Sequence, residues 1–185
     1  MFQTILKNIA KALLAGDISY MIIGGQAVLL YGEPRLTKDI DITLGIGIEG
    51  LPHIKRIAES INLKPLVEDS DAFAKETLVF PVADEKSGIR VDFIFSFSSY
   101  ERQAIDRAKA VRIEDVPIMF ASLEDLVIQK IISGRPRDLE DIKAILIKNP
   151  EYDADHIERW LAEFDTSLEE DYSGLFKKII KDIQS

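Results

Sequence analysis

The sequence contains no cysteine among its 185 residues. Disulfide bonds, thiolate metal sites and catalysis by a cysteine nucleophile are therefore excluded. The two histidines, His53 and His156, lie far apart in sequence, and neither has a metal-ligand partner at helical spacing, which argues against a histidine-based zinc site. Any metal bound by this chain must take oxygen ligands, and oxygen ligands favour Mg²⁺ or Mn²⁺.

Long apolar runs are also missing. One of the longest, residues 20–23, is far too short to cross a bilayer. Residues 1–11 are amphipathic and carry lysines, and they lack the continuous apolar stretch and the small-residue cleavage site of a signal peptide. We therefore expect a cytoplasmic protein with no membrane partner.

Positive charge is scarce, since 23 lysines and arginines stand against 32 acidic residues and give a net charge of -9. This balance argues against broad electrostatic binding to nucleic acid. It leaves room for a local basic patch, and Lys130, Arg135 and Arg137 form one.

Hydrophobic periodicity and turn residues predict the order of the elements. We expect helices over residues 1–15, 26–31, 51–61, 98–107, 122–132, 136–146, 153–164 and 167–183. We expect strands over residues 20–23, 40–44, 78–82 and 89–95, short extended segments at 111–113 and 118–120, and irregular chain with a short edge strand over 62–74. Ser122 and Ser167 each begin a capping-box pattern, Thr166 or Ser167 is expected to cap the last helix, and Gly134 is expected to end a helix. The order predicts an α+β half over residues 1–121, with a small mixed β-sheet flanked by helices, and a C-terminal α-helical region over residues 122–185.

Two aspartates stand two residues apart in the second expected strand. On a strand, Asp39 and Asp41 point to one side, and Ile40 and Ile42 point to the other. Adjacent carboxylates repel each other unless a cation joins them, and Mg²⁺ prefers such hard oxygen ligands. The spacing therefore predicts a metal site.

A third aspartate, Asp92, lies in the apolar strand 89–95. If that strand pairs beside residues 40–44, the three carboxylates converge and could hold two metal ions for displacement at phosphorus. The alternative is that Asp92 is an ordinary salt-bridge partner of Arg90 or Arg112.

Gly24 and Gly25 stand between the first strand and the following helix. Glycine lets the backbone approach a phosphate closely, and a helix N-terminus offers free N–H donors. The two glycines therefore predict a phosphate cradle that belongs to the same site as the carboxylates.

Taken in order, these residues resemble the nucleotidyltransferase superfamily: Gly24-Gly25, thirteen intervening residues, Asp39-Ile40-Asp41, and then Asp92. The AbiEii-like group of bacterial nucleotidyltransferase toxins is the most similar, because Gly24-Gly25-Gln26-Ala27 and the run from Arg35 to Asp41 match its first motif. Lys130, Arg135, Arg137-Asp138 and Asp141 look like its second, helical motif. The second glycine stands where many active members have serine, and the chain is shorter than the typical toxins.

The resemblance implies a nucleotidyltransferase-like fold, with residues 1–121 as the catalytic domain. Asp39, Asp41 and Asp92 would be catalytic and would hold Mg²⁺ or Mn²⁺. Gly24, Gly25, Arg35, Lys130 and Asp138 would bind the nucleoside triphosphate. For Arg35 the alternative is a surface arginine. For Asp138 the choice lies between a partner of Lys130 or Arg135 and an ordinary exposed helix acid.

Three functions are compatible with this pattern. The first is transfer of a nucleoside monophosphate to an RNA, a protein or a small molecule, as the toxin of a toxin–antitoxin pair with a cognate antitoxin protein as partner. The second is an antibiotic-modifying nucleotidyltransferase, since an acidic cleft suits cationic aminoglycosides. The third is a non-catalytic relative that acts as a binding module, which the missing serine favours.

Overall fold

The computed structural model describes residues 2–34 and 36–184. The chain divides into two compact units. The first comprises Met1–Gln26 with Leu36–Ala121, and the second comprises Ala27–Arg35 with Ser122–Ser185. The division places the helix from Gly24 to Tyr31 partly in each unit. Over the described residues, the first unit has mixed α+β structure and the second is helical.

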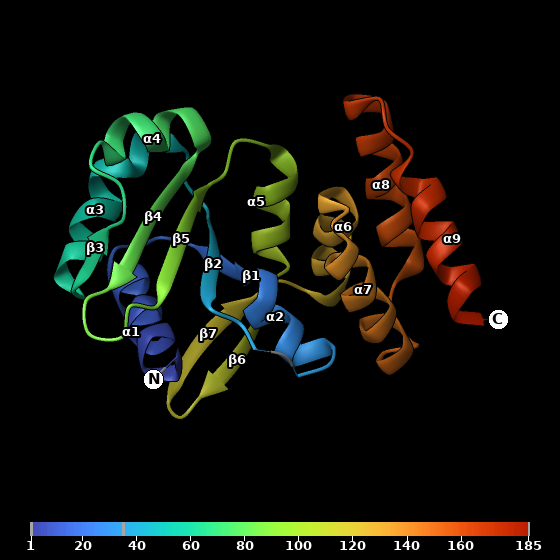
Figure 1. The fold of residues 1–185 in the computed structure, drawn as a ribbon, viewed down its shortest axis with the longest axis horizontal. Coiled ribbons are helices and arrows are strands. Elements are labelled where there is room, and N and C mark those ends of the chain that lie inside the picture. The colour runs from blue at the N-terminus through green and yellow to red at the C-terminus, as the bar shows by residue number, and fades with distance from the viewer. Residues whose placement is uncertain (1, 35, 185) are drawn as a thin grey trace. The chain divides into compact units, whose positions relative to one another are not determined.

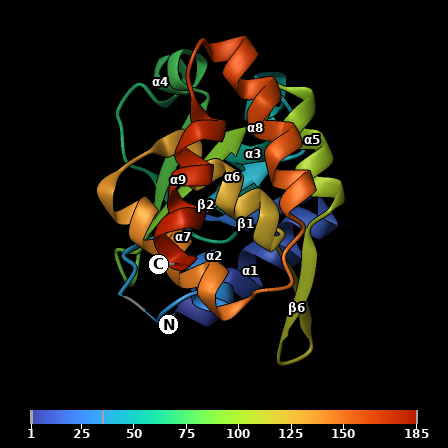
Figure 2. The ribbon, with the colours of Figure 1, turned by 90° about the vertical axis from the view of Figure 1, so that its right-hand side faces the viewer.

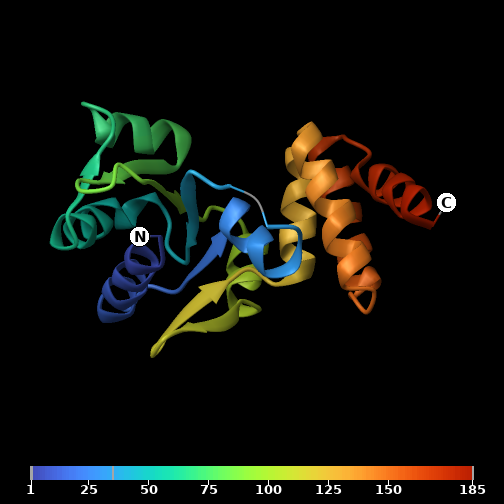
Figure 3. The ribbon, with the colours of Figure 1, turned by 60° about the horizontal axis from the view of Figure 1, so that its bottom comes forward.

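Over the described residues, the first unit contains one seven-stranded mixed sheet, in the order β3-β4-β5-β2-β1-β7-β6 (Figure 1). Only β1·β7 and β2·β5 pair in parallel, and the other neighbours are antiparallel. Figures 1 and 3 show the β6–β7 hairpin reaching beyond the other strands. The strands are β1 (Tyr20–Ile23), β2 (Asp39–Leu44), β3 (Leu63–Pro65), β4 (Val79–Asp84), β5 (Arg90–Phe95), β6 (Lys109–Ile113) and β7 (Val116–Phe120).

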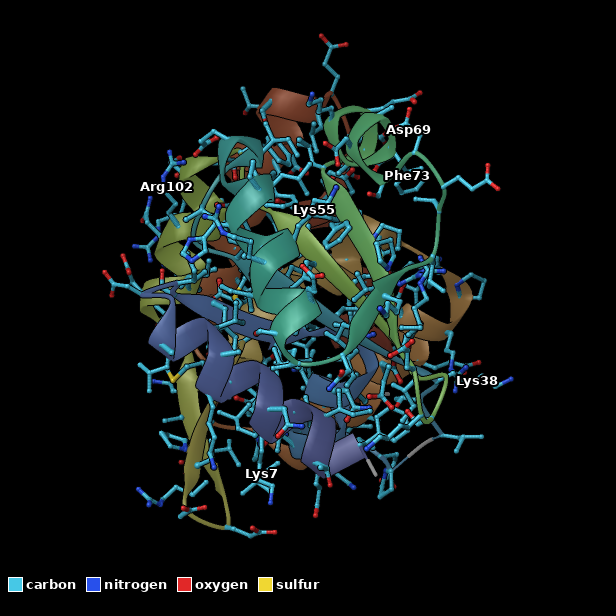
Figure 4. The ribbon with its side chains drawn as sticks, turned by 90° about the vertical axis from the view of Figure 1, so that its left-hand side faces the viewer. Lys7, Lys38, Lys55, Asp69, Phe73 and Arg102 are labelled. Carbon is cyan, nitrogen blue, oxygen red and sulfur yellow. The ribbon has the colours of Figure 1, made fainter. Side chains whose placement is uncertain are left out.

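The helices of the first unit pack beside this sheet. Helices α1 and α3 contact each other and lie side by side in Figure 4. Lys7 on α1 forms a 2.6 Å ion pair with Glu114 in the turn between β6 and β7. The bounds are α1 (Phe2–Ala15), α2 (Gly24–Tyr31), the 3-10 turn η1 (Ile48–Gly50), α3 (Leu51–Ser60), α4 (Ser70–Thr77) and α5 (Ser99–Asp106).

Helix α4 corrects one expectation, because residues 62–74 are not irregular throughout. The short edge strand β3 is present, but it is followed by a helix that begins at Ser70. Asp69 caps that helix by accepting a hydrogen bond from the backbone N–H of Ala72 at 3.0 Å, and Ala74 is completely buried. This short, polar helix buries few side chains and therefore has no clear apolar period. Packing against the rest of the unit, and not the sequence pattern, stabilises it.

The second unit contains the C-terminal helices α6 (Leu123–Ser133), α7 (Pro136–Lys148), α8 (Ala154–Leu168) and α9 (Tyr172–Gln184). Figure 2 looks onto these helices, with α8 and α9 side by side. The expected caps of α6 are confirmed: the Ser122 hydroxyl accepts from the N–H of Asp125 at 3.1 Å, and Gly134 ends the helix with φ +61°. Trp160 and Phe176 are buried in this unit.

The cap expected at Thr166 or Ser167 is wrong. Helix α8 continues through both residues to Leu168, and their hydroxyls bond backward to the carbonyls of Ala162 and Phe164. Serine and threonine can form this backward bond inside a helix instead of capping one, so the local pattern is ambiguous.

Across the described part of the chain, every helix is too short or too polar to traverse a lipid bilayer.

Candidate active site

Three neighbouring strands bring the first motif and Asp92 together. In the antiparallel pair β1·β2, Ile23 lies opposite Asp41, and Gly24 follows Ile23 directly. In the parallel pair β2·β5, Asp41 lies opposite Asp92. Neighbouring strands are about 4.8 Å apart. The expectation that the strand carrying Asp92 pairs beside the strand carrying Asp39 and Asp41 is therefore confirmed.

The alternation of side chains along β2 and β5 is also as expected. Asp39, Asp41 and Asp92 are partly exposed and lie on one face of the sheet. On the opposite face the residues between them are completely buried: Ile40, Ile42, Val91 and Phe93. The apolar residues hold the two strands in register, and the carboxylates gain a common face with access to solvent.

Gly24 lies against the Asp41 carboxylate. Its φ of +60° is in the left-handed region, which favours glycine. A Cβ atom on Gly24 would overlap Oδ2 of Asp41 and would lie 3.0 Å from its Cγ. Helix α2 begins at Gly24 itself, two residues earlier than the sequence pattern predicts. The N-terminus of α2 and the Asp41 carboxylate therefore lie next to each other.

We expect Gly24→Ala to cost more stability than the same change at Gly88. Both glycines have positive φ, but a Cβ on Gly88 meets nothing within 4 Å. Alanine at Gly88 should therefore cost about 1–2 kcal/mol from conformation alone. Alanine at Gly24 adds the collision with Asp41, for a total of about 2–4 kcal/mol. Chemical denaturation followed by circular dichroism measures both, and equal losses would show that Asp41 moves away without cost.

Two residues of the first motif are tied together inside the first unit. The Gln26 amide donates a 2.6 Å buried hydrogen bond to the hydroxyl of Thr37. This bond joins the first turn of α2 to the segment that enters β2 at Asp39. Sequence reasoning assigned no role to either side chain, although their place inside the motif was a usable signal. Arg35, expected to bind the nucleotide, lies outside the described residues.

Asp92 is held by an arginine on its own strand. Arg90 Nε donates to Oδ1 at 2.8 Å and to Oδ2 at 3.1 Å of Asp92. The salt bridge between Asp92 and Arg90 is thus confirmed, and the role of Asp92 as a metal ligand stays a prediction. Arg112, the other candidate, lies on β6, and its guanidinium donates to the backbone carbonyl of Asp115 at 3.2 Å.

The carboxylates offer the right atoms for a divalent cation, since all the donors on this face are oxygens. Their side chains nevertheless do not form a ready cage. Over residues 2–34 and 36–184, no three aspartate, glutamate or histidine side chains gather closely enough to hold a metal ion. The carboxylates therefore fit a divalent cation in the chemistry of their atoms and in the register of their strands. The side chain of Asp92, however, is hydrogen-bonded to Arg90.

Lys130 and Asp138 belong to the second unit, where they form a buried ion-pair cluster. The ammonium of Lys130 lies 2.8 Å from Oδ1 of Asp138 and 2.7 Å from Oδ2 of Asp141. Arg135 donates to Oδ2 of Asp138 at 2.6 Å. Asp138 is therefore a partner of both Lys130 and Arg135, and the exposed-acid alternative is wrong, because Asp138 is 3% exposed. Any role of this cluster toward a nucleotide stays a prediction.

Burial alone would raise the pKa of Asp138, but hydrogen bonds from Arg135 and Lys130 outweigh burial and hold that pKa below its ordinary value. A lowered folded-state pKa favours the folded protein once the carboxyl is ionised. Asp138 therefore contributes stability above the ordinary aspartate pKa of about 3.9, and this contribution disappears as pH falls through the lowered folded-state value.

We expect Asp138→Asn to be less stable than the wild type at pH 7, and the gap to close as pH falls below the ordinary aspartate pKa of about 3.9 and through the lowered folded-state pKa. Urea unfolding followed by Trp160 fluorescence measures this, since Trp160 is the single tryptophan and lies in the same unit. Asp182→Asn, which removes an exposed pair with Lys143, is the matched control and should cost less than about 1 kcal/mol. A gap for Asp138→Asn that is independent of pH would contradict the assignment.

Comparison with known proteins adds to this geometry. The sequence model of a family described as "Nucleotidyltransferase of unknown function (DUF6036)" matches residues 2–178. No curated protein matches the chain.

Among solved structures, the solution structure of the antibiotic-resistance factor ANT(2'')-Ia is similar with a TM-score of 0.62 and 18% identity, over 90% of this chain and 92% of that one. A crystal structure of ANT(2'')-Ia in complex with adenylyl-2''-tobramycin is similar with a TM-score of 0.60 and 18% identity, over 90% of this chain and 98% of that one. An antigenic nucleotidyltransferase-like protein from Paracoccidioides brasiliensis has a TM-score of 0.58 and 17% identity, over 89% of this chain and 87% of that one. These similarities show a nucleotidyltransferase fold.

Proposed function

This chain belongs to the nucleotidyltransferase family DUF6036, and from that premise we propose that it transfers a nucleoside monophosphate from a nucleoside triphosphate to an acceptor hydroxyl. The observation that carries the proposal is the position of Asp41. It lies opposite Asp92 on the neighbouring strand, and its carboxylate lies against Gly24 at the start of α2. Acidic side chains and a helix N-terminus thus meet at the same end of three neighbouring central strands, an arrangement that suits phosphoryl chemistry.

In the proposed reaction, the acceptor oxygen attacks the α-phosphorus and forms a new P–O bond. The bond from that phosphorus to the bridging oxygen breaks, and pyrophosphate leaves. Asp92 would orient the acceptor and take its proton, and the backbone N–H groups near Gly24 and Gly25 would bind phosphate oxygens. Asp39 and Asp41, with Asp92, would hold the Mg²⁺ or Mn²⁺. When bound, such a cation offsets the charge of the triphosphate and of the leaving pyrophosphate.

A labelling experiment tests this function. The purified chain would be incubated with each nucleoside triphosphate, Mg²⁺ or Mn²⁺, and RNA, protein or small-molecule acceptors. Label at the α-phosphate should pass to an acceptor, and label at the γ-phosphate should leave as pyrophosphate. Transfer of the γ-label would indicate a kinase instead. Absence of both nucleotide binding and product would contradict the proposal.

A small cationic antibiotic is the second acceptor class that an observation favours. The fold covers nearly all of ANT(2'')-Ia, a structure of which contains adenylyl-2''-tobramycin. The net charge of -9 would also attract a cationic aminoglycoside. Growth of cells expressing the chain on aminoglycosides and lincosamides separates this acceptor from a macromolecular one, because only a drug-modifying enzyme should raise the tolerated concentration.

The AbiEii-like relation and the toxin role belong to the macromolecular alternative. If the chain is such a toxin, its expression should arrest growth, and a cognate antitoxin protein should relieve the arrest. A growth arrest that persists after Asp41→Asn would instead indicate a non-catalytic binding module.

A further inference from the structure

Arg90 lies among the carboxylates of the candidate site. It is the first residue of β5, and in the parallel register it lies opposite Asp39, while Asp92 lies opposite Asp41. Alternation along the strand places Arg90 and Asp92 on the same face as both β2 aspartates. One basic and three acidic side chains therefore occupy adjacent positions on two strands.

The Arg90 side chain is 52% exposed, but the carboxylate that it contacts is largely buried. Its Nε reaches both oxygens of Asp92, at 2.8 and 3.1 Å, and the side chain of Asp92 is only 13% exposed. The pKa of the Arg90 guanidinium is raised, mainly by its hydrogen bond with Asp92, and the charges of Asp39 and Asp41 act in the same direction. Arg90 thus contacts Asp92 directly and lies in the electrostatic field of Asp39 and Asp41.

The cluster needs a positive charge near it. Three carboxylates on one face repel one another, and the repulsion falls when a cation lies among them. The Arg90 guanidinium donates to both oxygens of Asp92, and its positive charge opposes a second cation on the same carboxylate. Arg90 and a cation bound by Asp92 therefore compete for the same atoms.

We propose that Arg90 is a built-in counterion, which offsets part of the charge of the acidic cluster until a divalent cation displaces it from Asp92 and which thereby weakens metal binding. This proposal rests on the proposed function, because it takes Asp92 to be a metal ligand. It explains why the described side chains form no ready metal cage although strand register brings Asp41 and Asp92 together. It also makes the occupancy of the site depend on the concentration of the metal, or of the metal–nucleotide complex.

The test measures metal binding rather than activity. Mn²⁺ binding to the full chain would be followed by electron paramagnetic resonance and by calorimetry, and Asp41→Asn would be used to subtract weak binding elsewhere on this acidic protein. We expect Arg90→Gln to bind Mn²⁺ about tenfold more tightly than the wild type, which corresponds to about 1.4 kcal/mol. Without metal, the same variant should melt at a lower temperature than the wild type, and its gain in melting temperature on adding Mn²⁺ should be larger.

Arg112→Gln is the matched control. It removes the same charge from the same unit, but β6 lies four strands from β5 in the sheet, about 19 Å away. Its Mn²⁺ affinity should equal that of the wild type. Arg90→Lys keeps the charge and loses the two-oxygen contact, so it should bind Mn²⁺ more tightly than the wild type and less tightly than Arg90→Gln. If Arg90→Gln does not fold, the Mn²⁺ affinity of Arg90→Lys alone tests the proposal.

The outcomes separate the two proposals. Equal Mn²⁺ affinity in the wild type and the Arg90 variants, or weaker binding in the variants, overturns the counterion role and leaves the proposed function standing. Mn²⁺ binding that is absent from all variants, or unaffected by Asp41→Asn, overturns the counterion role and removes the metal site as well.

Discussion

Replacing Lys130 with methionine is expected to lower the free energy of unfolding by about 3–5 kcal/mol. The Lys130 side chain is 5% exposed, and its ammonium is shared by Asp138 and Asp141, which are also buried. Methionine fills much of the same volume, so the loss comes from two buried carboxylates that no longer share a cation. Urea unfolding followed by Trp160 fluorescence measures the change in the same unit.

Lys143→Met is the control for this experiment. Lys143 pairs with Asp182 at 3.0 Å, but both side chains are more than 40% exposed. Exposed ion pairs contribute about 0–1 kcal/mol, so this variant should be nearly as stable as the wild type. If Lys130→Met lost no more stability than Lys143→Met and still lost nucleotide binding, Lys130 would be a phosphate ligand rather than the centre of a structural cluster.

The second large effect is expected at Asp41. Asparagine preserves the shape of the side chain and removes its charge, next to Gly24 and opposite Asp92. Loss of a partner that only supports a metal ligand costs about 10–100-fold. If Asp41 binds the metal as proposed, its loss should therefore lower nucleotidyl transfer by more than about 100-fold. Release of pyrophosphate and transfer of the α-label both measure the rate.

Asp115→Asn is the matched change for Asp41→Asn. Asp115 is an exposed acid in the turn between β6 and β7 of the same unit. Its substitution should leave the rate unchanged. A rate for Asp41→Asn within threefold of the Asp115→Asn rate, with both proteins folded, would remove Asp41 from the catalytic set.

Much of the local structure could be predicted from the sequence. The alternation in β2 and β5 predicted which face carries Asp39, Asp41 and Asp92, and the burial of Ile40 and Val91 on the other face confirms it. Such predictions succeed because the period of a strand is a local property of the chain. Helix α4 and the cap of α9 were not predicted correctly, because α4 has no strong apolar period and serine can bond forward or backward in a helix.

The sequence did not determine which residues pair as ions. The sequence allowed Arg90 or Arg112 as the partner of Asp92, and the strand order alone excludes Arg112 by placing β6 at the far edge of the sheet. Likewise, Lys130 and Asp138 are eight residues apart, and only the packing of α6 on α7 brings them together in a buried pair.

By itself the sequence determined which oxygen-bearing side chains are available, that no thiol chemistry can occur, and that Asp39 and Asp41 share a face. Only the tertiary structure decided that Asp41 lies opposite Asp92 and against Gly24, and that Arg90 is held among the acids. The reason is physical: side-chain direction follows from dihedral angles within a few residues, whereas strand register depends on burying apolar faces that come from distant parts of the chain.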